Sequence, residues 1–329
     1  MAAPSKQPTT PSQKPKIVIP DDFPPYIAGS RALERMRRYG EVIPYTTRAR
    51  TEDEFLSRMV DAEVVVNIRA YSKFTREALQ RLPTLRMISV LGTGTDNVDL
   101  AATKELGITV TNTPGVATEA IAEHALTLML SVARNIPVIH QQTKAGKWER
   151  GLVTQLWGKT LGIVGTGLIG THMARLGRGI GMNVIAWTFN PSKEKAKEIG
   201  FRYVPFDELI RTSDVISLHL RLSDKTQGII GNREMGMMKS TAILINTARG
   251  ALIDKRAFVA ALWKGQIAGA GLDVYDHEPI PPGDQILQLD RVVLTPHSSG
   301  MVPEVMEKSN EMTVENVINF LAGTPVHVV

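Results

Sequence analysis

The chain contains no cysteine, and this absence excludes several kinds of chemistry at once. Disulfide bonds, thiolate nucleophiles and cysteine-bearing zinc sites are all ruled out, and a reducing, cytoplasmic location is expected. No apolar run approaches the roughly 18 residues that cross a membrane, and the N-terminus MAAPSKQPTTPSQKP lacks the apolar core of a signal peptide. We therefore expect no association with a membrane.

A strong excess of one charge is also lacking. Lysine and arginine number 38 against 33 aspartate and glutamate residues, and the net charge of +5 is spread along the chain. A nucleic-acid partner is therefore not expected. No histidine spacing of the HExxH kind is present, so no metal site is expected either. The chain has 329 residues, 43% of them hydrophobic, which is typical of a globular protein with two domains.

Apolar stretches alternate with helical segments in the first part of the chain. Residues 16–20, 62–68 and 85–92 are predicted strands, and this alternation indicates a parallel α/β sheet. Residues 118–147 are apolar at helical spacing and are predicted to form one long helix. Residues 1–15 are predicted to be a disordered tail.

The second part of the chain has a clearer strand pattern. Its apolar stretches are TLGIVG, NVIAWT, FRYV, DVISLHL, TAILINTA, GAGLDVY and VVLTPH. Continuous Val, Ile and Leu runs are typical of strands buried on both faces, so we expect a doubly wound nucleotide-binding domain over residues 117–301. The helical segment 303–322 lies too far along the chain for that domain. It is expected to return to the first domain, which then comprises residues 16–116 and 302–329.

A glycine fingerprint, LGIVGTGLIG, begins this second pattern. Gly165 suits a tight turn, Gly167 lets the backbone approach a pyrophosphate, and Gly170 lets the helix pack closely on its strand. Leu168 and Ile169 would begin the helix whose N-terminus faces the phosphate. The spacing is also compatible with a tight turn that binds nothing, so the fingerprint alone leaves both interpretations open.

Three polar residues follow later strands of the pattern: Arg249 in NTARG, Glu278 in YDHEP and His297 in TPHSSG. Open α/β sheets bind their ligands at the carboxyl ends of strands. Arg249 offers a planar fork for a carboxylate, and His297 can exchange a proton with a carbonyl oxygen. Glu278 would hold the imidazole and favour its charged form. Each residue alone is compatible with a structural role, but together they suit the transfer of a hydride and a proton.

The motifs LGIVGTGLIG, INTARG, GLDVYDHEP and TPHSSG together resemble those of the D-isomer-specific 2-hydroxyacid dehydrogenase family. The resemblance covers nearly the whole chain after the tail. It implies a Rossmann-type nucleotide-binding domain, a flavodoxin-like discontinuous substrate domain and a homodimer. It also implies hydride transfer between NAD(P)H and a small 2-keto acid or D-2-hydroxy acid, with Arg249, Glu278 and His297 as catalytic residues.

The resemblance implies further binding residues. Those expected at the substrate, besides Arg249 and His297, are Arg69, Gly92, Thr93 and Gly94. Those expected around the dinucleotide, besides the fingerprint, are Thr118, Thr188, His219, Thr247, Asp273 and Gly300. Asp273 is expected to accept a hydrogen bond from the nicotinamide carboxamide, although a helix cap would satisfy its carboxylate equally well.

Position 188 departs from the family pattern. NAD-binding members usually have an acidic residue there, which accepts hydrogen bonds from the adenine-ribose hydroxyls, whereas this chain has Thr188. A carboxylate would repel a 2'-phosphate, so its absence leaves NAD and NADP both open. Asn190, Ser192 and Lys193 offer donors nearby. NAD is preferred because it is the commoner cofactor in the family.

Two other functions share this architecture. Formate dehydrogenases typically pair the catalytic histidine with glutamine, and Glu278 favours 2-hydroxy acids instead. Dinucleotide-sensing transcriptional corepressors keep the same folds and bind partners without turnover. The complete set of Arg249, Glu278 and His297 favours an enzyme.

Overall fold

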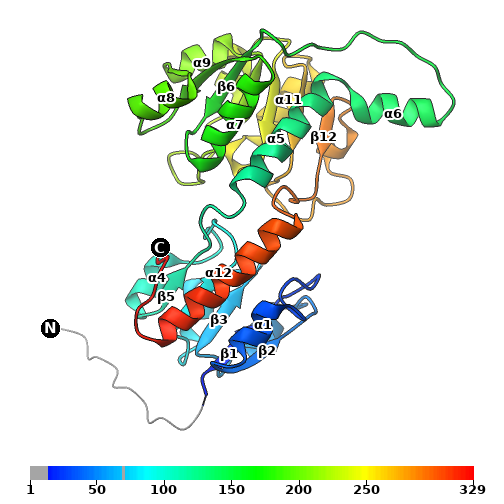
Figure 1. Cartoon of the computed structure of the whole chain (residues 1–329). Helices are drawn as coiled ribbons and strands as arrows, with labels where there is room; N and C mark the ends of the chain where they lie inside the picture. The colour runs from blue at the N-terminus through cyan, green and yellow to red at the C-terminus, as the bar shows by residue number, and fades with distance from the viewer. Residues whose placement is uncertain (1–13, 69–70) are drawn as a thin grey trace. The chain divides into compact units, whose positions relative to one another are not determined.

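The computed structural model describes residues 14–68 and 71–329, which form two α/β units (Figure 1). Unit 1 comprises the described residues up to Pro114 together with Met306–Val329, and unit 2 comprises Gly115–Val305. The sequence analysis predicted these divisions after residues 116 and 301. Most of the predicted tail, 1–15, lies outside the described residues.

Unit 1 is built on a five-stranded parallel sheet. Its strands, in spatial order, are β2 (Glu41–Pro44), β1 (Lys16–Ile19), β3 (Val64–Asn67), β4 (Met87–Val90) and β5 (Thr109–Thr111). This 2-1-3-4-5 order is the flavodoxin-like one, as predicted. The sequence analysis found β1, β3 and β4 but missed β2 and β5, which are the edge strands of the sheet.

Short capped helices cover this sheet. They are α1 (Arg31–Met36), α2 (Glu52–Ser57), α3 (Arg76–Gln80) and α4 (Leu100–Glu105), joined by α12 (Pro303–Leu321). A side chain at the start of each short helix accepts a backbone amide hydrogen bond, as Ser30 does from Leu33. Val314 and Val317 of α12 pack in the core of unit 1 beside Ile17, so the chain does return to this unit.

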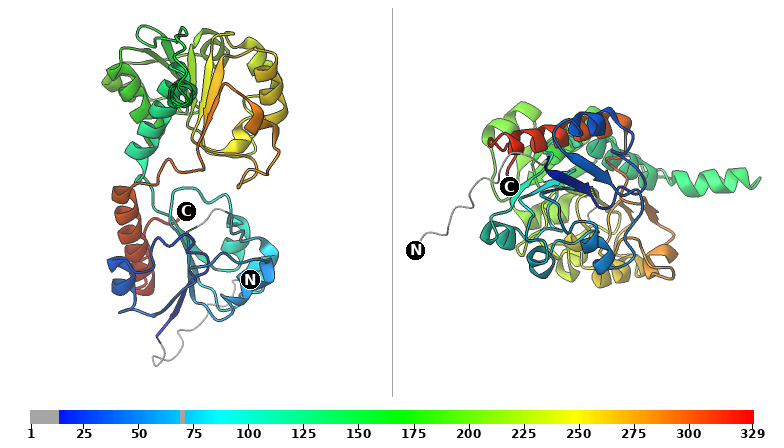
Figure 2. Two further views of the ribbon diagram at one scale, coloured as in Figure 1. Left: turned by 90° about the vertical axis from the view of Figure 1, so that its right-hand side faces the viewer. Right: turned by 90° about the horizontal axis from the view of Figure 1, so that it is seen from below.

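Unit 2 is a seven-stranded parallel sheet with helices on both faces (Figure 2). Its strands, in spatial order, are β12 (Val292–Leu294), β11 (Gly269–Leu272), β10 (Ile243–Asn246), β9 (Val215–Leu218), β6 (Thr160–Val164), β7 (Asn183–Trp187) and β8 (Arg202–Tyr203). Numbered within the unit, this is the 3-2-1-4-5-6 order of Rossmann-type sheets with one strand added. All the stretches predicted as strands in this part of the chain contain strands.

Alternate residues of the central strands enter two hydrophobic cores, one on each face of the sheet. Ile163 and Ile245 pack with α5 (Thr118–Ala133) and α7 (Leu168–Gly179), whereas Val164 packs on the opposite face. The other helices of unit 2 are α6 (Ile136–Lys144), α8 (Lys193–Ile199), α9 (Phe206–Thr212), α10 (Asn232–Met237), η1 (Gly250–Leu252), α11 (Lys255–Trp263) and η2 (Gln285–Gln288). Burial on both faces explains the continuous apolar strands seen in the sequence.

The prediction of one long helix over 118–147 is wrong. Helix α5 ends at Ala133, and α6 begins only after Asn135, whose φ of 50° is left-handed. Asparagine tolerates this conformation, and Pro137 in the first turn of α6 has no amide hydrogen to continue the earlier helix. No residue of α6 is buried, and the helix extends away from the rest of unit 2 (Figure 1).

Two features are absent from residues 14–68 and 71–329. No helix there is both long and apolar enough to cross a membrane. No group of three or more His, Asp or Glu side chains in these ranges is placed to hold a metal ion.

Candidate active site

The predicted site residues of unit 2 lie at one edge of its sheet, because its strands are parallel and their carboxyl ends share that edge. The glycine loop follows β6, Thr188 follows β7, His219 follows β9, Thr247 and Arg249 follow β10, Asp273 and Glu278 follow β11, and His297 follows β12. Residues spread over more than 130 positions of sequence therefore meet at the edge where open parallel sheets bind ligands.

The glycine loop has the geometry that the fingerprint predicts. Gly165 has a φ of 99°, and a side chain there would also meet the His219 carbonyl oxygen at 2.7 Å. A Cβ at Gly170 would overlap the Gly165 carbonyl oxygen, so only glycine lets α7 approach the loop this closely. A Cβ at Gly167 would meet nothing within 4 Å. The space in front of Gly167 gives a phosphate access to the first turn of α7, where Leu168 and Ile169 lie.

Replacing Gly170 with alanine is expected to displace the glycine loop and weaken dinucleotide binding by about tenfold or more, because the clash is with backbone and not with a flexible side chain. Fluorescence titration with NADH and NADPH measures the loss. The matched control is Gly179→Ala at the exposed end of the same helix, where a Cβ meets nothing within 4 Å. Equal binding by the Gly170→Ala variant and the control would contradict the assignment of the loop.

His219 lies behind the glycine loop. Its backbone amide donates to the Val164 carbonyl oxygen at 2.8 Å, and its Nε2 lies 2.8 Å from the Ser217 hydroxyl. Burial lowers the pKa of His219 to about 4, so the imidazole is neutral at physiological pH. The side chain therefore brings no positive charge to the loop that it supports.

Two threonines of the predicted cofactor site differ in their contacts. The buried Thr247 hydroxyl has no hydrogen-bond partner among the described residues, and an unsatisfied buried hydroxyl is unfavourable. This orphan hydroxyl fits the expected contact with a dinucleotide. The Thr118 hydroxyl already donates to the Gly115 carbonyl oxygen at 2.9 Å. Gly300, also predicted at this site, lies close to Ala117.

Asp273 is fully buried and holds the segment that carries His297. Its Oδ1 accepts from the Thr295 hydroxyl at 2.6 Å and the Ser298 amide at 2.8 Å, and its Oδ2 accepts from the Ser299 amide at 2.9 Å. Loop amides and a hydroxyl thus satisfy this carboxylate, and it does not act as a helix cap. A carboxylate has about four acceptor positions, so Oδ2 retains capacity for the predicted carboxamide contact.

His297 and Glu278 form the pair that the sequence predicts. Nδ1 of His297 lies 2.7 Å from Oε2 of Glu278, and Oε1 of Glu278 accepts the Tyr275 amide at 3.0 Å. Burial raises the pKa of Glu278, but the hydrogen bond and charge of His297, the Tyr275 amide and the charge of Arg249 outweigh it and hold this pKa below its ordinary value. Glu278 is therefore a carboxylate at neutral pH. Nε2 of His297 is left for another partner.

The backbone of His297 is unusual as well. Its φ of 52° is left-handed, a conformation that costs about 1–2 kcal/mol for an ordinary side chain. The His297 amide donates to the Asp273 carbonyl oxygen at 2.8 Å, which helps to hold this conformation. Such outliers persist where the surrounding structure fixes them, and they are common at functional sites.

Arg249 is positioned by the turn after β10. The Asn246 side chain accepts the Ala248 amide at 3.0 Å and donates to the Arg249 carbonyl oxygen at 2.8 Å. A Cβ at the next residue, Gly250, would overlap the backbone of Tyr275, so the turn packs directly on the start of the segment that carries Glu278. This packing brings the positive charge of Arg249 close enough to lower the pKa of Glu278.

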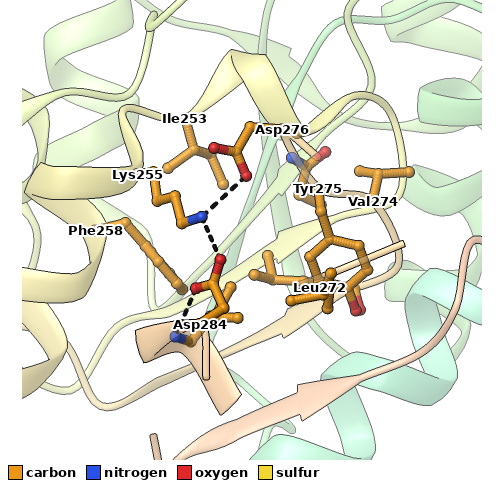
Figure 3. Close-up of a pocket in the computed structure, with 12 residues that line it drawn as sticks. Ile253, Lys255, Phe258, Leu272, Val274, Tyr275, Asp276 and Asp284 are labelled. Carbon is orange, nitrogen blue, oxygen red and sulfur yellow. Dashed lines mark hydrogen bonds and ion pairs between the residues drawn. The ribbon is translucent and has the colours of Figure 1, made fainter. Parts of the chain in front are cut away.

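The segment that carries Glu278 is also anchored on α11. Figure 3 shows Lys255 between Asp276 and Asp284, with its Nζ 3.3 Å and 2.5 Å from their carboxylates. The Lys255 hydrogen bond holds the pKa of Asp284 below its ordinary value, so this pair stays charged. The Tyr275 hydroxyl is shared between the carbonyl oxygens of Leu272 and Thr295, at 3.0 and 2.8 Å. These contacts fix the ends of β11 and β12 relative to each other.

The sequence analysis missed four residues that hold the site residues in place: His124, Lys255, Tyr275 and Thr295. Tyr275 and Thr295 lie inside the GLDVY and TPH motifs, so the motifs themselves contained a signal. His124 and Lys255 come from helices and have no local signal. The Thr295 hydroxyl donates to Asp273, so it must accept from His124, whose Nε2 lies 2.9 Å away and carries the hydrogen.

The predicted substrate residues of unit 1 follow β4. Gly92 has a φ of 133°, and its amide donates to the Thr113 hydroxyl oxygen at 2.7 Å, so this amide is already satisfied within unit 1. The Asn112 side chain donates to the Thr93 carbonyl oxygen at 2.8 Å, and Gly94 follows. The role of this loop toward a substrate stays a prediction. Arg69 lies outside the described residues.

Comparison with known proteins gives consistent matches. Residues 126–299 match the profile described as D-isomer specific 2-hydroxyacid dehydrogenase, NAD binding domain. A glyoxylate reductase of Korarchaeum cryptofilum is 36% identical over 317 residues, which are 94% of each chain.

Two solved structures with the same fold contain ligands. The D-lactate dehydrogenase of Aquifex aeolicus complexed with NAD and lactic acid has a TM-score of 0.84 and 30% identity, over 94% of this chain and 96% of that one. The acyclic imino acid reductase Bsp5 in complex with NADPH and D-Arg has a TM-score of 0.85 and 30% identity, over 95% and 99%. Sequence and structure agree, and the chain belongs to the D-isomer specific 2-hydroxyacid dehydrogenase family.

Proposed function

We propose that the protein reduces small 2-keto acids to D-2-hydroxy acids. The observation that carries the proposal is the 2.7 Å hydrogen bond between His297 Nδ1 and Glu278 Oε2, at the ligand-binding edge of a Rossmann-type sheet. A bound reduced nicotinamide supplies the hydride. The glycine loop and the orphan Thr247 hydroxyl fit such a dinucleotide.

The protein's own groups move the proton and hold the acid. His297 donates a proton from Nε2 to the carbonyl oxygen, because Glu278 occupies Nδ1 and keeps the ring oriented. In the reverse direction, neutral His297 removes that proton from the hydroxyl. Arg249 binds the substrate carboxylate through its guanidinium, whose planar fork suits two parallel hydrogen bonds.

A panel of keto acids tests this function directly. Loss of reduced nicotinamide absorbance is followed with glyoxylate, hydroxypyruvate, pyruvate, phenylpyruvate and 2-ketoglutarate, each with NADH and NADPH. Glyoxylate comes first because the Korarchaeum relative is a glyoxylate reductase. Turnover of at least one keto acid is expected. Dinucleotide binding without turnover would contradict the proposal and favour formate oxidation or dinucleotide-dependent partner binding.

Replacing Glu278 with glutamine is expected to lower kcat for keto-acid reduction by about tenfold and to remove the acid limb of the pH profile. The pKa of Glu278 is held below its ordinary value, so the carboxylate that orients the His297 ring is present at neutral pH and is lost only as pH falls through that lowered pKa. Glutamine has no carboxyl group to titrate there. Profiles of kcat/KM against pH measure the difference. A variant with the wild-type profile would remove Glu278 from the proposed pair.

A homodimer is part of the proposal. Helix α6 has no buried residue, and a short helix without tertiary packing is marginally stable in water. Ile136, Trp148, Leu152 and Trp157, on α6 and the segment after it, are between 53% and 106% exposed. A second copy of the chain would cover these apolar side chains. Analytical ultracentrifugation of the wild type and of Leu152→Arg tests the assembly, and a monomeric wild type would exclude it.

Two further parts of the proposal have their own tests. The D-isomer specificity of the family predicts a D-2-hydroxy acid as product, which chiral chromatography identifies. The cytoplasmic location expected from the sequence is checked by cell fractionation.

A further inference from the structure

A backbone hydrogen bond connects the end of β7 to the glycine loop. The Gly165 amide donates to the carbonyl oxygen of Trp187, the last residue of β7, at 2.8 Å. The next residue, Thr188, therefore stands beside the fingerprint. In dinucleotide folds this is the place where a carboxylate binds the ribose hydroxyls of NAD, or where a nearby cation accommodates the 2'-phosphate of NADP. The connection from Thr188 to Ser192 contains no carboxylate.

A lysine contacts the fingerprint from the same side. Nζ of Lys195, in the first turn of α8, donates to the carbonyl oxygen of Thr166 at 3.1 Å, and Thr166 is the residue between Gly165 and Gly167. This partly buried ammonium is paired with no carboxylate in the described chain. The bond to the Thr166 carbonyl oxygen uses one of the three hydrogens of the ammonium, so two remain available for other acceptors.

The polar groups around Lys195 form a connected set. The Thr166 hydroxyl lies 2.9 Å from the Tyr203 hydroxyl, which also accepts the Ser192 amide at 3.3 Å. The Ser192 hydroxyl accepts the Lys195 amide at 3.2 Å. Lys195 and Tyr203 thus tie the segment after β7 to the glycine loop in two places, which holds the ammonium near the expected ribose.

The nearby charges favour an anion. Lys193 and Lys197 are exposed on the same helix, and Glu198 is paired with Arg175. Among the described residues, Glu194 is the one carboxylate that a hydrogen bond joins to this segment, since it accepts the Ser192 hydroxyl at 2.9 Å. It is exposed on the helix surface. The cations therefore outnumber the unpaired carboxylates around Lys195.

We propose that Lys195, with Thr188, forms a binding site for the 2'-phosphate of NADP(H), and that the protein prefers NADP(H) over NAD(H). This inference rests on the proposed use of a nicotinamide dinucleotide. It reverses the preference for NAD drawn from frequency in the family. Lysine serves phosphates as a point charge, so the preference should weaken as salt is added.

Calorimetric titration without any keto acid tests the site. Wild-type protein is expected to bind NADP+ about tenfold or more tightly than NAD+, and 2',5'-ADP more tightly than 5'-AMP, with a difference that shrinks at high salt. Lys195→Gln should abolish the difference by weakening NADP+ alone, and Lys195→Arg should retain it. Thr188→Asp should favour NAD+. Lys264→Gln, at the exposed C-terminal end of α11 and away from the carboxyl ends of the strands, is the control for the loss of a lysine and should behave as wild type.

The outcomes separate this site from the proposed function. Equal or weaker binding of NADP+ by the wild type overturns the 2'-phosphate site, even if keto acids are reduced with NADH. An equal loss of NAD+ and NADP+ affinity in Lys195→Gln also overturns it, because the lysine then only supports the glycine loop. Binding of neither dinucleotide would instead contradict the proposed function itself.

Discussion

Replacing His297 with asparagine is expected to lower kcat for keto-acid reduction by about 10²- to 10⁴-fold, the usual contribution of a positioned general acid. Asparagine is the appropriate replacement because residue 297 has a φ of 52°, which asparagine tolerates better than alanine. Its amide cannot transfer a proton to the forming alkoxide. Dinucleotide affinity should change little, because the backbone bond to Asp273 remains. Steady-state kinetics and fluorescence titration measure the two quantities separately.

His277→Asn is the matched control for this substitution. The His277 side chain is 77% exposed, although it precedes Glu278 directly, and its Nδ1 lies 3.3 Å from the Asp276 carboxylate. The same chemical change there should leave kcat unchanged. A comparable loss in both variants would indicate a disturbed loop, and wild-type kcat in His297→Asn would remove His297 from the mechanism.

Replacing Arg249 with alanine is expected to lower kcat/KM for the keto acid by about 10- to 150-fold, mainly through a higher KM. This range corresponds to about 1.5–3 kcal/mol for hydrogen bonds to a charged group. The turn itself should persist, because Asn246 holds it through backbone atoms of Ala248 and Arg249. Arg249→Lys keeps the charge without the planar fork, so an intermediate loss is expected. Initial-rate kinetics over a range of keto-acid concentrations give both constants.

Arg256→Ala is the control for the loss of a positive charge. Arg256 is exposed on α11, close in sequence but outside the proposed site. Its removal should leave KM for the keto acid unchanged. If Arg249→Ala also left KM and kcat unchanged, the proposed carboxylate-binding role would be wrong.

The local sequence pattern predicted most of the strands of unit 2. Its strands are buried on both faces, so their sequences are apolar without interruption and stand out from the helices between them. Strand β2 was missed because Glu41–Pro44 is half-exposed and ends in proline. The break at Asn135 was missed because the apolar spacing continues across it, although Pro137 marks the point.

The sequence also predicted the chemical groups of the site, but it did not predict their geometry. Arg249, Glu278 and His297 each follow an apolar stretch, and parallel strands must bring such positions to one edge. The left-handed φ of His297 and the Asp273 contacts that support it depend on residues from another strand. No local pattern encodes them.

The sequence by itself determined the α/β class, the glycine loop and the three groups proposed for catalysis, because strand burial and side-chain chemistry are local properties. Only the tertiary structure decided how these groups are held. Tyr275 joins the ends of two strands, Lys255 anchors the Glu278 segment, and Lys195 contacts the glycine loop from a different helix. These contacts join residues from separate strands and helices, so they exist only once the sheet has brought them together.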